Sequence, residues 1–224
     1  MLRGGIIMEQ RNIVTQTLVN MYNIYTDIGR IIQVIEEETK NNNLTAVGGD
    51  AKVSWENSYA YYSPEAWLPS WFARVYQDER FEDKAVGFCI HLGGERYDIG
   101  DQEKLEAAQI HFPFVNISLI EMDTNIREVK RTNLNDILWA AGWYKPRWIN
   151  NIENESLVFS QGKEIDGNAK LITYFLDLFT LNSEEVVSRL VVEPMVQMLA
   201  ENTDWIIKNV LPVIKINPPG SAGE

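Results

Sequence analysis

The amino-acid sequence predicts an α+β fold: a central antiparallel sheet with a long N-terminal helix and a C-terminal helical segment. Three observations predict it. Apolar residues recur with helical spacing over residues 14–35, residues 45–125 are rich in strand-forming residues between glycine pairs, and helix signals return after Ser183. Because helices and strands are grouped in separate parts of the chain, an α+β domain is favoured over alternating βαβ units.

The first expected element is a helix over residues 9–40. Seven apolar residues with spacings of 4, 3, 4, 3, 4 and 3 form its stripe: Val14, Leu18, Met21, Tyr25, Ile28, Ile32 and Ile35. Further apolar residues widen that stripe: Ile13, Tyr22, Ile24, Ile31 and Val34. The stripe is broader than the seam of a two-stranded coiled coil. We therefore expect this helix to pack on a sheet or on other helices, and partly against another subunit.

Strands are expected next, because alternating or continuous apolar runs lie between turn signals. The predicted strands are residues 51–56, 70–77, 85–92 and 112–122. The connections between them are mostly short, and short connections favour antiparallel pairing.

The C-terminal half returns to helix. A helix is predicted over 132–144, where Pro146 stops it, and SLVFS (156–160) is a possible short strand. The run KLITYFLDLFTL (170–181) fits either a buried strand or a buried helix, and its length and the following cap signal favour helix. Ser183 caps a helix over 184–201 that Pro194 should kink or split, and a last helix covers 203–211.

The domain organisation expected from this pattern is a single α+β domain over residues 8–212. Residues 213–224 form a proline- and glycine-containing tail that we expect to be disordered. Arg-Gly-Gly shortly before Met8 resembles a translated, purine-rich bacterial ribosome-binding site. Residues 1–7 are therefore interpreted as a disordered leader that precedes the true start.

Composition restricts compartment and partners. The net charge of −12 disfavours nucleic acid and anionic membranes as partners. Cys89 is the single cysteine, so no intramolecular disulfide forms, which fits a reducing cytoplasm. No run of about 18 apolar residues predicts a membrane span, and the N-terminus does not have the pattern of a signal peptide.

Residues 54–76 contain eight aromatic side chains. Pro64 and Pro69 interrupt the segment, so it is not one regular element. The aromatic residues fit the wall of a core, a protein interface or a platform for a small ligand. Four of them are the candidate interface residues: Tyr61, Tyr62, Trp67 and Trp71.

Three residues are candidate metal ligands: Cys89, His91 and His111. Cys89 and His91 are two positions apart and would point to the same face of a strand, and His111 begins another strand region. The spacing matches none of the compact zinc patterns. The alternatives are a buried, inert thiol with hydrogen-bonded imidazoles, or a Cys89 and His111 pair of nucleophile and base.

A local excess of positive charge lies in residues 127–148 of this acidic chain. Its basic and aromatic residues are Arg127, Lys130, Arg131, Trp143, Tyr144, Lys145, Arg147 and Trp148. Such a patch can bind an anionic ligand or a nucleotide. It can equally pair with the acidic remainder of the fold or with another subunit.

The phosphate-binding, dinucleotide-binding, nucleophile-elbow and zinc-protease motifs are missing from the sequence. The function expected is therefore that of a non-catalytic cytoplasmic protein, acting through protein–protein contacts in an assembly, accessory or regulatory role. It is expected to be oligomeric, and no cofactor is assigned. The alternatives are ligand binding or metal-dependent catalysis by the strand region 89–123, and anion or nucleotide binding by the 127–148 patch.

Overall fold

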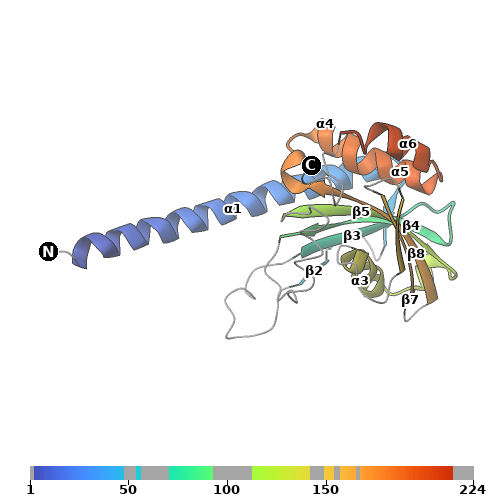
Figure 1. Cartoon of the computed structure of the whole chain (residues 1–224), viewed down its shortest axis with the longest axis horizontal. Coiled ribbons are helices and arrows are strands. Elements are labelled where there is room, and N and C mark those ends of the chain that lie inside the picture. The colour runs from blue at the N-terminus through green and yellow to red at the C-terminus, as the bar shows by residue number, and fades with distance from the viewer. Residues whose placement is uncertain are drawn as a thin grey trace, which may run out of the picture.

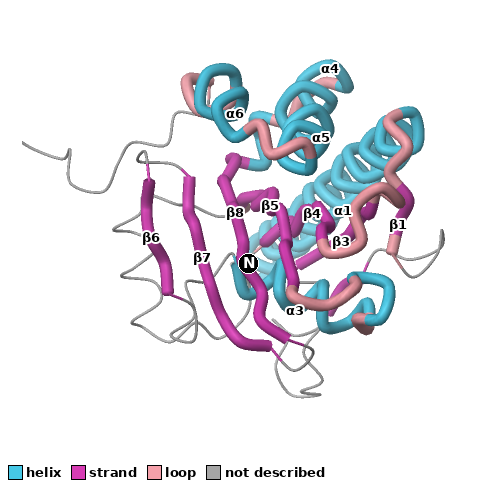
Figure 2. The backbone as a smooth tube through the Cα atoms, turned by 90° about the vertical axis from the view of Figure 1, so that its right-hand side faces the viewer, coloured by secondary structure: helices cyan, strands magenta, loops and turns pink. Residues whose placement is uncertain are grey.

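The computed structural model has an α+β fold in which a long helix and a group of shorter helices cover one antiparallel sheet (Figures 1 and 2). It describes residues 3–47, 54–56, 71–92, 113–141, 149–153, 157–164 and 167–213. The predicted fold class is confirmed. The predicted tail beyond residue 213 lies outside the described residues.

The described strands form a single eight-stranded sheet in which the paired strands are antiparallel. The strands are β1 (Thr45–Ala46), β2 (Ser54–Glu56), β3 (Trp71–Gln77), β4 (Lys84–His91), β5 (Phe114–Met122), β6 (Ile149–Glu153), β7 (Leu157–Glu164) and β8 (Gly167–Asp177). Their order is β1-β3-β4-β5-β8-β7-β6, and β2 also pairs with β3. The strands predicted at 70–77, 85–92 and 112–122 are confirmed to within two residues.

The prediction of a helix over residues 170–181 is wrong. Residues up to Asp177 belong to β8, and the short 3₁₀ helix η3 (Leu178–Thr180) follows. β8 lies inside the sheet between β5 and β7. Leu171 packs on one face of the sheet, while Tyr174 and Leu176 pack on the other. A strand covered on both faces is apolar at nearly every position, which removes the alternation that distinguishes a strand from a helix.

The two faces of the sheet have separate cores. On one face, Ile28, Ile31 and Ile35 of α1 (Arg3–Asn41) pack with residues of β4 and β5 and with the C-terminal helices. On the other face lies α3 (Arg131–Ala141), preceded by the 3₁₀ helix η2 (Ile126–Glu128). Figure 2 shows α1, α4, α5 and α6 on one side of the sheet and α3 on the other.

Gly87 allows α3 to approach β4 closely. A Cβ atom at this position would lie 2.4 Å from the backbone oxygen of Arg74 and 2.6 Å from Cδ1 of Leu138 in α3. Both distances are shorter than van der Waals contact, so a larger residue would push α3 away from the sheet. The helix predicted over 132–144 is confirmed as far as residue 141, and residues 142–144 lie outside the described residues.

The C-terminal helices are α4 (Glu184–Val187), the π turn η4 (Ser188–Val192), α5 (Glu193–Leu199) and α6 (Thr203–Asn209). The side chain of Ser183 accepts a hydrogen bond from the Val186 backbone N–H, as its predicted role as a cap requires. Pro194 has no N–H to donate to the carbonyl of Leu190. The buried hydroxyl of Tyr174 donates to that carbonyl instead, at 2.5 Å. The predicted interruption of this helix at Pro194 is therefore confirmed.

Helix α1 is 39 residues long and begins at Arg3. Residues 3–7, which the sequence pattern assigns to a leader, are therefore helical in the structure. At the other end, Asn43 adopts a positive φ of 61°, and the chain leaves the helix to enter β1. An asparagine tolerates this left-handed conformation better than most residues do, and it is a common helix terminator.

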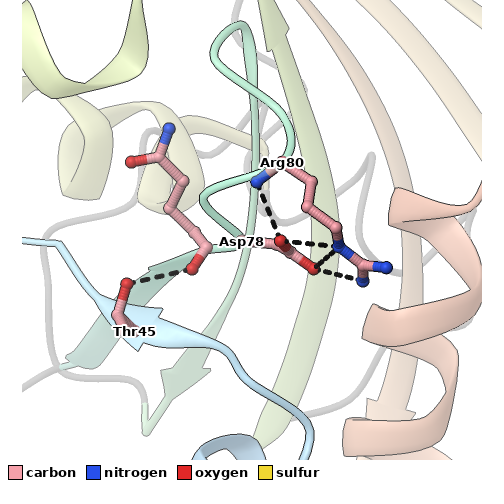
Figure 3. Close-up of polar contacts among 4 residues, drawn as sticks. Thr45, Asp78 and Arg80 are labelled. Atoms are coloured by element: carbon pink, nitrogen blue, oxygen red, sulfur yellow. Dashed lines mark hydrogen bonds and ion pairs between the residues drawn. The ribbon is translucent and has the colours of Figure 1, made fainter.

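The turn between β3 and β4 is held by the carboxylate of Asp78 (Figure 3). It accepts hydrogen bonds from the backbone N–H of Arg80 at 2.9 Å and from the Arg80 side chain at 2.5–3.0 Å. The hydrogen bonds from the Arg80 guanidinium hold the pKa of Asp78 below its ordinary value. Beside this turn, the hydroxyl of Thr45 donates to the carbonyl of Gln77 at 3.1 Å and fixes β1 to β3.

Candidate functional site

The N-terminal half of α1 extends away from the body of the protein as a single projecting helix (Figure 1). We call residues 3–24 of α1 the arm. Several of its large apolar side chains are in water, with exposures of 59% for Ile13, 59% for Leu18 and 73% for Tyr22. Between residues 10 and 26, Arg11 is the only charged residue. The arm therefore has the composition of a helix that is covered by protein rather than solvated.

A polar clasp fixes the base of α1 to the sheet. The carboxylate of Glu36 lies 2.7 Å from Nε of the buried Arg74 and accepts a hydrogen bond from the hydroxyl of Tyr76 at 2.8 Å. Burial, followed by the nearby Glu36 carboxylate, raises the pKa of the Tyr76 hydroxyl, which stays protonated as a donor. Since Arg74 and Tyr76 both belong to β3, the clasp sets the direction in which the arm leaves the body.

A groove of about 620 Å³ runs beside α1 where the helix joins the body. Its α1 wall is formed by residues between Ile24 and Glu37, and its opposite wall by residues 178–187. The apolar lining residues are Ile24, Ile28, Ile31, Val34, Leu178, Phe179, Leu181 and Val187. Phe179 stands at the rim with 67% of its surface exposed. The groove thus has an apolar floor that is open to solvent.

The rim of the groove is mainly acidic. Asp27, Glu37 and Glu184 line it, against a single basic residue, Arg30. Arg30 is paired with Asp27 at 3.1 Å, and Glu37 accepts a hydrogen bond from Gln33 at 3.1 Å. The rim therefore favours an occupant without acidic side chains.

The structure describes two of the three candidate metal ligands, Cys89 and His91. Cys89 and His91 do lie on the same face of β4, and both are buried. Nε2 of His91 is 2.8 Å from Oδ1 of Asn116, and the imidazole stacks on Phe114 with 4.5 Å between ring centroids. His111 lies outside the described residues. Among the residues that the structure describes, no three or more His, Cys, Asp or Glu side chains form a group that could hold a metal ion. The metal site stays a prediction.

Burial lowers the pKa of His91 to about 3, although the hydrogen bond with Asn116 opposes this shift. The imidazole is therefore neutral at physiological pH. Asn116 also donates to the carbonyl of Leu138 at 3.0 Å, and the hydroxyls of Ser118 and Thr173 lie 2.8 Å apart. This buried polar row joins β4, β5 and β8 to α3. Its sequence signal is the pair of polar residues Asn116 and Ser118 inside the apolar run FVNISLIEM, neither of which is among the predicted site residues.

The structure describes three of the eight residues of the basic and aromatic patch. Arg127 and Lys130 are exposed just before α3, and Arg131 is half-buried. Arg127 lies 3.3 Å from the carboxylate of Glu79, an exposed ion pair that contributes little. The other five members lie outside the described residues: Trp143, Tyr144, Lys145, Arg147 and Trp148. Anion binding by this patch stays a prediction.

Among the candidate interface residues, Trp71 is described. It is 5% exposed and packs with Ala73 and Val75 in the core beneath α3. This position fits the interpretation of the aromatic segment as a wall of the core. Tyr61, Tyr62 and Trp67 lie outside the described residues.

No protein-family model, curated protein or solved structure matches this chain. Within the described part of the chain, no helix combines the length and apolar character that a membrane span requires. The functional proposal therefore depends on the geometry of the arm and the groove.

Proposed function

We propose that this protein is a non-catalytic cytoplasmic component of a protein assembly, and that it acts through contacts made by α1. The observation that carries the proposal is the arm, an apolar helix that projects beyond the body with Ile13, Leu18 and Tyr22 in water. The groove at the base of the same helix offers a second apolar surface.

Leaving such an apolar helix exposed to water has a free-energy cost. A helix without tertiary contacts loses its main source of stability, because helices in proteins are stabilised mostly by packing of their apolar face. Burying one Leu or Ile side chain contributes about 1.5–3 kcal/mol. The arm has several such side chains and no charged residue over positions 12–24, so a protein surface that covers this part is strongly favoured.

Leu18→Glu is expected to weaken self-association of the full chain by about 100-fold, because it removes an apolar contact and forces a carboxylate into the interface. Sedimentation velocity over a concentration series measures the effect, with a single chain of 25.7 kDa as the reference mass. The matched control is Asn209→Glu, which adds the same charge at an exposed position of α6, outside the arm and the groove.

The control variant should associate as the wild type does. Because Leu18 lies outside the core of the body, the melting temperature of the dissociated variant should stay close to that of the dissociated wild type. Equal association of Leu18→Glu and wild type would contradict a role for this face of the arm.

A further inference from the structure

We infer that the groove receives the arm of a second copy of this chain, in a reciprocal exchange that places each arm in the groove of the other copy. The inference rests on the proposed function, since it names the partner of the α1 surface. It is a helix-in-groove contact, in which an amphipathic helix places its apolar side in an apolar cleft.

The arm and the groove share one continuous apolar line. Ile13, Ile24 and Ile31 are separated by 11 and 7 residues, which are close to whole numbers of helical turns, so the three lie along one side of α1. Ile31 lines the groove, and Ile24 lies at the boundary between groove and arm. If α1 of a second copy ran along this side of α1, it would contact the exposed arm of the first copy. Its own arm would then enter the groove of the first copy without a change of direction.

The length of the groove fits a helix. It follows α1 from Ile24 to Glu37, which is roughly 20 Å at 1.5 Å per residue. That length accommodates between three and four turns of an arm. The walls formed by α1 and by residues 178–187 would contact an inserted helix on two sides.

Contact on two sides explains why the apolar arc of the arm is wide. Leu18 and Ile13 are exposed on well-separated sides of the helix, which a single narrow seam would not cover. Gln16 and Asn23, which are 7 residues apart, lie together on the remaining side. Gln16 donates a hydrogen bond at 2.9 Å to Asn20, which borders the line of Ile13 and Ile24.

Charge favours a second copy as the occupant. The rim carries Asp27, Glu37 and Glu184 against Arg30, whereas the arm carries Arg3, Glu9 and Arg11 and has no acidic residue after Glu9. The rest of the chain is acidic, with a net charge of −12. An antiparallel exchange keeps the two bodies at opposite ends of the paired helices, which limits their repulsion.

The test is photo-crosslinking from the rim of the groove. The full chain is prepared with p-benzoylphenylalanine in place of the exposed Phe179, and it is mixed with ¹⁵N-labelled wild type. After irradiation, mass spectrometry identifies the crosslinked peptides and their isotope labels. We expect crosslinks from position 179 to residues 3–24 of the labelled copy, and we expect Leu18→Glu in that copy to abolish them.

The outcomes separate the inference from the proposed function. Crosslinks between copies to any segment other than the arm would overturn the exchange but keep an interface. A monomeric chain that crosslinks in cells to a different protein would also overturn the exchange while leaving the proposed function intact. A chain that is monomeric, and that forms no crosslink to another protein molecule either when purified or in cells, would overturn both the exchange of arms and the proposed function.

Discussion

Replacing Glu36 with glutamine is expected to lower the free energy of unfolding by about 3 kcal/mol. The carboxylate lies 2.7 Å from Nε of Arg74, whose side chain is only 3% exposed, and it also accepts the hydrogen bond from Tyr76. Glu36→Gln removes the negative charge and leaves the buried guanidinium without its carboxylate. Breaking a buried ion pair from one side is costly because the remaining charge stays desolvated.

Urea denaturation at neutral pH measures this loss, with Glu37→Gln as the matched control. Glu37 is the next residue of α1, is exposed, and accepts a hydrogen bond only from Gln33 among its described contacts. The control should change stability by less than about 0.5 kcal/mol, as surface substitutions usually do. Equal losses in the two variants would show that the clasp does not hold α1 to the sheet.

Acidification is expected to destabilise the protein through His91, by up to about 1.4 kcal/mol for each pH unit below about 6. The pKa of His91 in the folded protein is about 3, because the imidazole is fully buried. The unfolded chain binds this proton near pH 6.5 and the folded chain does not, so stability is lost as pH falls toward 3. Above pH 6.5 both states are neutral, and the contribution to pH dependence disappears.

The measurement is the unfolding free energy at pH 7, 6, 5 and 4 for wild type and for His91→Gln, whose amide can still donate to Asn116. The variant should show a flatter decline between pH 6 and pH 4 because its side chain does not titrate. His111→Gln is the control, since His111 is the other histidine of the chain. A flatter decline in His111→Gln, with an unchanged slope in His91→Gln, would refute the assignment.

The sequence predicts the helices and strands whose environment leaves a periodic pattern. The stripe from Val14 to Ile35 identifies α1, and Ser183 and Pro194 identify the start and the interruption of the C-terminal helices. β8 is mistaken for a helix because both of its faces are buried. A pattern of apolar residues reports burial, and it identifies the secondary structure only where one face is polar.

The candidate site is less predictable, because it depends on which half of α1 the body covers. Residues on both halves of the stripe look alike in sequence, yet Ile28 is 2% exposed and Leu18 is 59% exposed. The groove combines α1 with residues 178–187, which are distant in the chain. Its position follows from the crossing of α1 over the sheet, which the Glu36 clasp helps to fix and which no local pattern predicts.

Hydrogen exchange of the arm tests most directly whether a second copy covers it. The measurement is mass-spectrometric exchange of peptides from residues 12–24 in the full wild-type chain over a range of protein concentrations. We predict slow exchange at high concentration that becomes fast on dilution, because a helix without tertiary contacts opens readily. Fast exchange of these amides at every concentration, in a chain that sediments with the mass of one copy, would contradict the exchange of arms between copies.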